Sequence, residues 1–202
     1  MLRPMPYPKD HKARTRQRIL ESALACFTRH GFAAVSIDQL MAHAGLTRGA
    51  FYAHFRSKSE VYAEAIANAR HLHRERIAAM LPVDAPARAR LRQFVEQYLS
   101  REHVNEPNRP CPLACLVTDV ASGDAHVRAT YTRIFEGMNR LLREMQETES
   151  DEDTLLAVSA MMIGTVAVCR ALDDPALVER LLASSRRQVA ELLAIETATE
   201  MA

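Results

Sequence analysis

The sequence predicts an all-α fold. Apolar residues recur at spacings of three and four along most of the 202 residues, which gives each predicted helix one buried face. The alternation typical of strands never persists, and the chain holds only six glycines. No apolar run approaches the length of a bilayer span, and the basic N-terminus lacks the apolar segment of a secretory signal. We therefore expect a cytoplasmic protein with no membrane partner.

Four helices are predicted in the first third of the chain: Lys12–Arg29, Ile37–Ala44, Arg48–Phe55 and Lys58–Leu81. Gly31 suits the left-handed residue that ends the first helix, and Gly45 supplies the turn between the next two. Ser36, Thr47 and Ser57 stand where N-cap residues belong, because their side-chain oxygens can accept hydrogen bonds from free N–H groups.

The rest of the chain is also helical, with five further predicted helices: Arg88–Arg101, Pro112–Ser122, Asp124–Glu147, Glu152–Leu172 and Pro175–Ile195. Prolines mark the loops that flank the first of these helices, and an acidic turn joins the last two. We expect two domains, a three-helix domain over residues 1–57 and a larger helical domain over residues 58–202.

Charge is distributed unevenly between these two parts. Residues 1–60 hold ten Lys and Arg against four Asp and Glu, a net charge of +6. The remaining 16 basic and 21 acidic residues give −5. A basic first third predicts contact with a polyanion there, with nucleic acid favoured over an anionic membrane surface.

The basic third also has the arrangement of a helix-turn-helix, in which the second short helix enters the major groove of DNA. Leu46, Phe51 and Phe55 share one face and should pack inward. The polar side chains left over offer donors to phosphates and base edges: Thr47, Arg48, Tyr52, His54 and Lys58. Arginine there can bind guanine through two hydrogen bonds, and Gly49 lets the backbone approach the duplex. Lys58 begins the following helix, where free N–H groups favour a phosphate.

The run 36-SIDQLMAHAGLTRGAFYAHFRSKSEVYAEAI-66 resembles the signature of the TetR family of bacterial transcriptional regulators. The resemblance extends over about Arg14–Ile66. It implies an N-terminal helix-turn-helix domain that binds palindromic DNA as a dimer, followed by a helical domain that binds a small ligand. It assigns DNA contacts to Ser36, Thr47, Arg48, Gly49, Tyr52, His54 and Lys58.

From these observations we expect a ligand-responsive transcriptional regulator, and the resemblance implies that it is most often a repressor. Its expected partners are operator DNA, an unidentified small-molecule effector and a second copy of the chain. We expect no cofactor and no metal. An enzyme is the alternative of a different class, because His71, His73 and Glu75 are close in sequence. They fall among arginines on a helix of exposed character, and the chain lacks a nucleophile motif or a glycine-rich phosphate loop.

The last two predicted helices carry more apolar positions than one core-facing stripe needs, which favours a dimer interface, although an intramolecular core could absorb part of this excess. The interface candidates are Leu155, Met162, Gly164, Val166, Leu177, Leu181, Val189 and Leu192. A ligand cavity is expected among the central helices, lined by Phe94, Tyr98, Leu116, Tyr131, Phe135, Met138 and Met161. Each of these residues would also suit an ordinary core.

The segment 109-RPCPLAC-115 suggests an alternative mode of regulation. Pro112 is favoured at the first position of a helix, which puts Cys111 at the N-cap, where free N–H groups stabilise a thiolate. Arg109 would add to this effect, and Cys115 lies one turn further along. The pair could sense electrophiles or oxidants, in a thiol-based repressor that acts through Cys111. A small apolar residue that happens to contain sulfur is the plainer interpretation.

Overall fold

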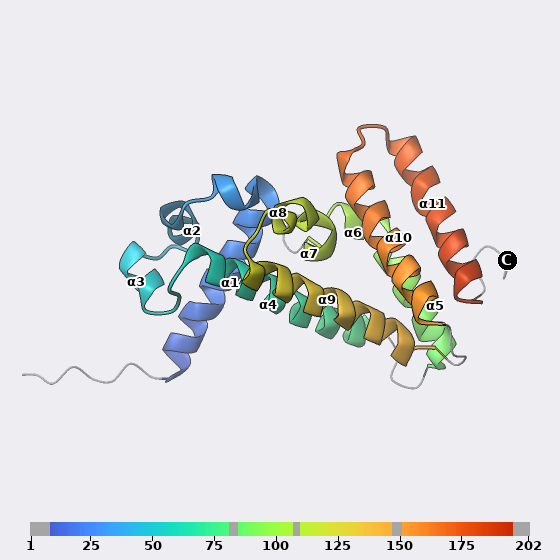
Figure 1. Ribbon diagram of the computed structural model, residues 1–202, viewed down its shortest axis with the longest axis horizontal. Helices are drawn as coiled ribbons and strands as arrows, with labels where there is room; N and C mark the ends of the chain where they lie inside the picture. Colours follow the sequence, from blue (N-terminus) through green and yellow to red (C-terminus); the bar gives the residue numbers. More distant parts are fainter. Residues whose placement is uncertain (1–8, 81–84, 107–109, 147–150, 196–202) are drawn as a thin grey trace, which may run out of the picture.

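The computed structural model describes residues 9–80, 85–106, 110–146 and 151–195, with side chains described for residues 11–69 of the first range. Every regular element within these ranges is a helix, so the predicted all-α class is confirmed. The molecule is elongated, with a head at one end, two long helices leading away from it, and a helical bundle at the other end (Figure 1).

The head consists of three helices, α1 (Lys9–Ala34), α2 (Ile37–His43) and α3 (Arg48–Tyr52). Of the predicted caps, those at Ser36 and Ser57 form, whereas Thr47 makes no side-chain cap bond. Ser36 accepts from the backbone of Gln39, and the Gln39 side chain accepts from the backbone of Ser36, which makes a complete capping box. α1 differs from the prediction because it continues for three residues past a kink at Gly31.

Two long helices, α4 (Lys58–Met80) and α9 (Ala125–Glu144), lie side by side and connect the head to the far bundle (Figure 1). α4 packs against α1 through aromatic rings. The Tyr62 ring lies 4.9 Å from the ring centroids of both Phe27 and Phe32. Its buried hydroxyl has no hydrogen-bond partner, and burial, followed by the nearby carboxylate of Asp119, raises the pKa of Tyr62.

The far bundle contains α5 (Ala87–Tyr98), α10 (Glu152–Ala171) and α11 (Pro175–Leu192) (Figure 1). α10 packs against both α9 and α11. Among the described residues it is the one helix long and apolar enough to cross a membrane, and 44% of its most apolar window is buried inside the molecule. A core helix that is covered on several sides has the same composition.

Two short helices, α7 (Pro112–Cys115) and α8 (Val117–Ala121), stand where one longer helix was expected, and another short helix, α6 (Arg101–Val104), follows α5. The helix predicted to reach Arg101 ends at Tyr98, and Ser100 caps a new one. The helix predicted over Pro112–Ser122 breaks at Leu116 (φ −114°, ψ 5°). The Tyr131 hydroxyl donates to the Leu113 carbonyl at 2.6 Å. In an unbroken α-helix this carbonyl would accept from the backbone N–H four residues later, so the hydroxyl competes with the helix at the point where it breaks.

α8 joins the body of the molecule to the head at the kink of α1. Gly31 has φ 78° and ψ 162°, and the next amide, Phe32 N–H, donates to Asp119 Oδ2 at 2.8 Å. A β-carbon on Gly31 would lie 3.2 Å from the same carboxylate oxygen. A second link, from the Ser59 hydroxyl to Asp124, joins α4 to the start of α9.

Gly31→Ala is expected to lower the free energy of unfolding by about 1–3 kcal/mol, because its backbone angles are strained for any residue with a β-carbon and the added methyl crowds Asp119. Urea unfolding followed by circular dichroism measures the change. Gly49→Ala is the matched control, since Gly49 lies in α3 with its nearest contact at 3.9 Å and should tolerate alanine. Equal effects of the two substitutions would contradict the strain at Gly31.

Candidate nucleic-acid interface

α2 and α3 are held on α1 by side chains of α1 that bind carbonyl oxygens at the end of α2. Ser22 Oγ donates to Leu40 O at 2.8 Å, and Arg18 Nη2 donates to Ala44 O at 2.7 Å. Leu46 N–H donates back to Met41 O at 2.9 Å, which closes the turn. Because the turn is tied at several points, α3 has a fixed direction relative to the rest of the head.

The inner face of α3 matches the sequence-based expectation. Phe51 and Phe55 are buried, with ring centroids 5.8 Å apart, and Leu46 packs against the same core. The Arg16 guanidinium lies 4.9 Å from the centroid of the Phe55 ring, and it also pairs with Glu64 of α4. The aromatic residues of this region therefore serve mainly to anchor α3.

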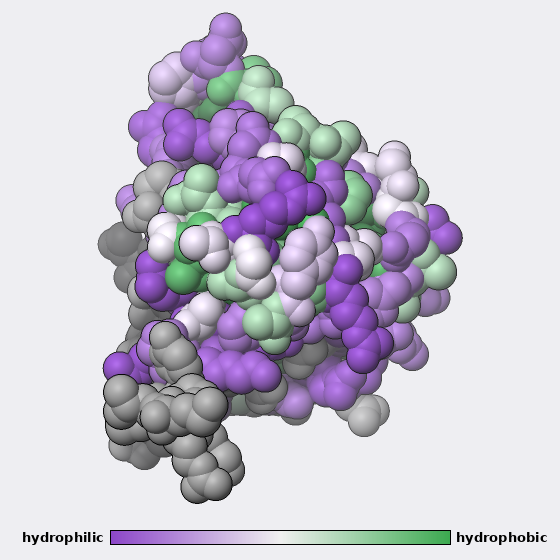
Figure 2. Space-filling model, turned by 90° about the vertical axis from the view of Figure 1, so that its left-hand side faces the viewer, coloured by the Kyte–Doolittle hydropathy of each residue, from purple (hydrophilic) through white to green (hydrophobic). Residues whose placement is uncertain are grey.

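The outer face of α3 presents four of the predicted residues together. Thr47, Arg48 and Gly49 are exposed at its start, and the Tyr52 side chain, 55% exposed, follows one turn later. The Thr47 hydroxyl makes no cap hydrogen bond, so it remains available. This end of the molecule is largely hydrophilic, with apolar side chains in small separate patches (Figure 2).

Arg48 does not stand alone on this face. Its Nη1 donates to Asp38 Oδ2 of α2 at 2.7 Å, and both side chains are about 60% exposed. A hydrogen bond with Tyr52, and then the Asp38 carboxylate, raise the pKa of Arg48. Sequence analysis missed Asp38, although an acid ten residues before the arginine, across a two-helix turn, was a visible signal.

Two of the predicted contact residues are partly engaged within the head. Ser36 is exposed, but its hydroxyl already takes part in the capping box. His54 is half-buried, and its Nδ1 atom is shielded from solvent with no hydrogen-bond partner. Burial lowers the pKa of His54, and the charges of Lys12 and Arg16 lower it further, so the ring favours its neutral form.

The position of Lys58 corrects the expectation that its ammonium is free for a phosphate. Nζ donates to Phe32 O at 2.7 Å and to Val35 O at 2.9 Å, and it lies 4.2 Å from the centroid of the Phe32 ring. Burial lowers the pKa of Lys58. The Lys58 side chain therefore donates to backbone carbonyls at the end of α1 and in the loop to α2. Carbonyls at a helix end have no partner within the helix and need a donor from elsewhere.

Lys58→Ala is therefore expected to destabilise the head, by about 1–2 kcal/mol, because two carbonyl oxygens lose a charged donor. Chemical unfolding of the whole chain measures the effect. Lys12→Ala removes the same charge from an exposed position of α1 and should change stability by less than about 0.5 kcal/mol. If both variants unfold at the same urea concentration, Lys58 does not hold the loop.

The residues expected to line a ligand cavity mostly fill the core instead. The Phe94 and Tyr98 rings pack 5.9 Å apart, Tyr98 stacks on His103 at 4.6 Å, and Leu116 is buried. Tyr131, Phe135 and Met161 are half-buried against the same core. These side chains pack against one another as ordinary core residues, which is the plainer of the two interpretations that their helical spacing allows.

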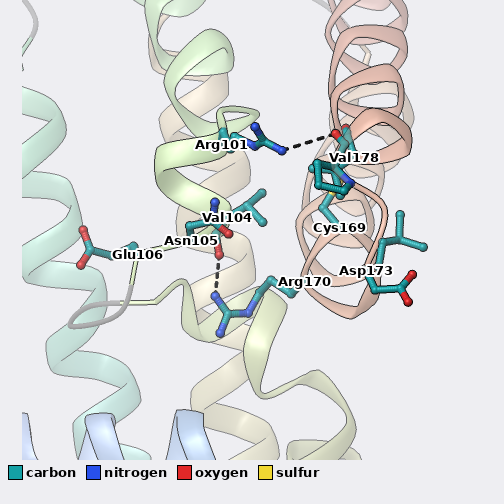
Figure 3. Close-up of a pocket in the computed structure, with 10 residues that line it drawn as sticks. Arg101, Val104, Asn105, Glu106, Cys169, Arg170, Asp173 and Val178 are labelled. Carbon is teal, nitrogen blue, oxygen red and sulfur yellow. Dashed lines mark hydrogen bonds between the residues drawn. The ribbon is translucent and has the colours of Figure 1, made fainter.

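The structure contains two cavities that bear on ligand binding. The smaller, of about 230 Å³, lies between α7 and α9, and among the expected lining residues Met138 borders it. The larger, of about 540 Å³, opens between α6, the end of α10 and the start of α11 (Figure 3). None of the seven expected residues borders the larger cavity.

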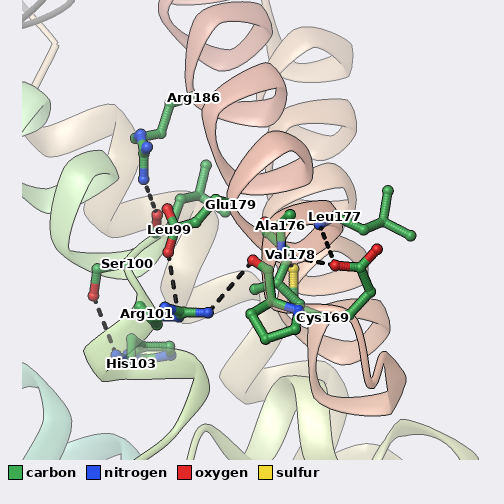
Figure 4. A network of polar contacts seen from close by, with 12 residues as sticks. Leu99, Ser100, Arg101, His103, Cys169, Ala176, Leu177, Val178, Glu179 and Arg186 are labelled. Carbon is green, nitrogen blue, oxygen red and sulfur yellow. Dashed lines mark hydrogen bonds and ion pairs between the residues drawn. The ribbon is translucent and has the colours of Figure 1, made fainter.

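Charged groups with defined partners surround the larger cavity. Arg170 Nη1 donates to Val104 O at 2.6 Å, and Arg101 reaches Pro175 O at 3.4 Å and Glu179 at 3.2 Å (Figures 3 and 4). These bonds attach α6 to the α10–α11 hairpin. Arg186 adds a further bond, from Nη1 to Leu99 O at 2.6 Å (Figure 4).

The predicted interface residues divide into two groups. Four of them belong to the core of a single chain and cannot form its surface: Leu155, Met162, Val166 and Val189. The other four remain accessible, with Leu181 half-buried and Gly164, Leu177 and Leu192 exposed. Exposed Leu156 and Val168 of α10 add to this second group, although sequence analysis did not single them out as interface residues.

The expected reactive thiolate at Cys111 is also corrected. Cys111 does occupy the N-cap of α7 before Pro112, but it is buried, and that burial raises the pKa of its thiol despite hydrogen bonds that act in the opposite direction. The Tyr98 hydroxyl lies 3.2 Å from its sulfur. Burial likewise raises the pKa of Cys115 to about 11. Burial raises the pKa of these cysteines more than the N-terminus of α7 lowers it, so both favour the thiol form.

Some expectations concern residues that the structure does not describe. Arg109 lies outside the described residues, as do the side chains of His71, His73 and Glu75. Within the described part of the chain, no group of three or more His, Cys, Asp or Glu side chains is placed to hold a metal ion.

The fold and the exposed face of α3 define a helix-turn-helix head on a helical body. Residues 19–65 match the sequence profile described as "Bacterial regulatory proteins, tetR family". The chain is 44% identical over 57 residues to the HTH-type transcriptional regulator SrpR of Pseudomonas putida, and 41% identical over 56 residues to the HTH-type transcriptional regulator AcrR of Shigella flexneri. Each match covers 28% of this chain and 27% or 26% of the relative.

Solved structures extend the likeness to the whole fold. The reduced form of Escherichia coli NemR superposes with a TM-score of 0.76, covering 91% of this chain and 98% of that one at 18% identity. A TetR-family regulator from Cytophaga hutchinsonii gives 0.77, covering 94% and 100%, also at 18% identity. Over residues 19–65 the chain thus matches the TetR family, and the rest of the molecule shares its fold with these solved structures. Its sequence matches about a quarter of the length of these curated relatives, which are transcriptional regulators rather than enzymes.

Proposed function

We propose that the chain is a cytoplasmic, ligand-responsive repressor that binds a palindromic operator as a homodimer and releases it when a small-molecule effector binds. The observation that carries this proposal is the exposed start of α3, where Thr47, Arg48, Gly49 and Tyr52 lie together on a helix fixed by the core behind it. Such a helix can place a few side chains against base edges in the major groove.

In this proposal the contact residues have unequal roles. Arg48 reads a base, while Thr47 and Tyr52 bind the DNA backbone and Gly49 lets the chain approach it. Ser36 contributes through its exposed position at the start of α2. His54 and Lys58 act chiefly by supporting the head, because their polar atoms are shielded from solvent or already bonded.

Arg48→Ala is expected to weaken binding to the specific site by about 1–3 kcal/mol and to relax preference at one base pair in each half-site. The probe is the duplex that the unmodified chain enriches from a randomised library, and fluorescence anisotropy measures its affinity. Arg14→Ala is the control, because it removes an exposed cation of α1 and should weaken all sequences alike. If enrichment yields an inverted repeat but Arg48→Ala binds it unchanged, the assignment of α3 to the groove is wrong.

The homodimer part of the proposal rests on apolar side chains that one chain leaves exposed on α10 and α11. Leu156, Val168, Leu177 and Leu192 are each exposed by 40–50%. Among the described residues, apart from the neighbouring residues and the nearby backbone of α10 itself, nothing approaches within 4 Å of a β-carbon built on Gly164, so a second helix has room there. A two-fold dimer through this face would present two heads to two half-sites.

Leu177→Asp should convert the dimer to monomers at micromolar concentration and weaken operator binding, because it places a charge in an apolar contact. Sedimentation velocity measures the mass. Val117→Asp is a matched control, since Val117 of α8 is 41% exposed against 40% for Leu177 but lies away from α10 and α11. A monomeric parent chain would refute the dimer, as would equal loss of dimer in both variants.

The effector part of the proposal has a place to act in the larger cavity, whose volume of about 540 Å³ falls within the range usual for small-molecule sites. It touches both α6 and the α10–α11 hairpin, so a ligand there would contact the body and the two helices that carry the proposed dimer face. The cavity of about 230 Å³ between α7 and α9 is small for such a ligand.

A further inference from the structure

Asp38 puts a carboxylate on the face of the head that the proposed function turns toward DNA. It lies in the first turn of α2, 61% exposed, and accepts from Arg48 Nη1 at 2.7 Å. A carboxylate at that place repels the phosphates of any duplex. The ion pair itself does not account for this carboxylate through folding stability, because a pair between two side chains this exposed contributes little.

The two residues sit on supports that do not move relative to each other. The end of α2 is tied to α1 through Ser22 and Arg18, and α3 is anchored by the fully buried ring of Phe51. Asp38 and Arg48 therefore face each other across a rigid two-helix unit. Only their side-chain torsions remain free, and the bond between them restricts those torsions.

That restriction matters because an arginine side chain has many rotamers. A bidentate contact to guanine needs the planar guanidinium in one orientation, and a freely moving side chain loses entropy when it adopts that orientation. Here the guanidinium of Arg48 is bonded through Nη1 to the Asp38 carboxylate of α2. It is thus oriented before any DNA arrives.

We propose that Asp38 is a specificity-determining residue, which orients Arg48 toward a base edge and repels duplexes that offer Arg48 no such base. The inference rests on the proposed function. On a matching sequence the oriented arginine gains its base contact, which offsets the repulsion. On any other sequence the carboxylate keeps Arg48 from turning to a phosphate and repels the backbone.

Asp38→Ala should therefore have unequal effects on two probes. Affinity for a pool of random duplexes should rise severalfold, because a negative charge is lost and Arg48 becomes free to bind phosphates. Affinity for the duplex enriched by the unmodified chain should rise less or fall. The ratio of the two affinities is expected to drop by about tenfold, within the range of one bidentate base contact. Thermal unfolding should remain unchanged.

Two control variants separate orientation from charge alone. Glu21→Gln removes an exposed carboxylate of α1, which bonds Gln17 rather than Arg48, and should raise both affinities by one factor. In an Arg48→Ala background, Asp38→Ala should likewise shift both affinities together and leave their ratio unchanged, since no arginine remains to be oriented.

Each outcome decides a different question. If the unmodified chain enriches no sequence, the proposed function fails. If it enriches one and Asp38→Ala behaves like Glu21→Gln, Asp38 acts through charge alone and the inference is overturned. A drop in the ratio that persists in the Arg48→Ala background would also overturn it, because Asp38 would then read a base itself, as carboxylates can with cytosine.

Discussion

Long cationic side chains that donate to carbonyl oxygens at helix ends tie the elements of this chain to one another, including the short helices α2 and α6. The last turn of a helix leaves carbonyls without partners, and short helices cannot bury enough apolar surface to fix their own direction. Among the described residues five cations fill this role, each bonding the end of another element: Arg18 on Ala44, Lys58 on Phe32 and Val35, Arg88 on Ala194, Arg170 on Val104, and Arg186 on Leu99. The head, α5, α6 and α11 are all tied in this way.

This use of cations changes what the charge of the head means. The net charge of +6 over the first 60 residues suggests a broad basic surface, yet Arg18 and Lys58 bind carbonyls and Arg16 pairs with Glu64. Arg48 remains exposed at the start of α3, and its guanidinium forms an ion pair with Asp38. Where a single cation faces the bases, its orientation matters more than the total charge of the head, since the total charge supplies mainly non-specific affinity.

The features that sequence predicted well are those set by neighbours a few residues apart. Ser36 and Ser57 were recognisable as caps, and each accepts from the amide three residues later. The inward face of Phe51 and Phe55 followed from a spacing of four. The break at Leu116 was hidden, because the bond that competes with the helix comes from Tyr131, 18 residues beyond the carbonyl it occupies. Lys58 was misjudged for the same reason, since its carbonyl partners precede it by more than 20 residues.

Sequence-based prediction is limited in the same way for the apolar surfaces of α10. Its composition, apolar on nearly every side, indicates that more than one face is covered, and periodicity separates those faces by angle. It does not say which face meets the core of its own chain. Leu155 and Met162 turned out to be inside, whereas Leu156 and Val168 point outward, although each outward residue is as apolar as its neighbours. Only the packing of α9 and α11 against α10 distinguishes the two sets, and it leaves an exposed apolar stripe of the kind that soluble proteins usually cover with a partner.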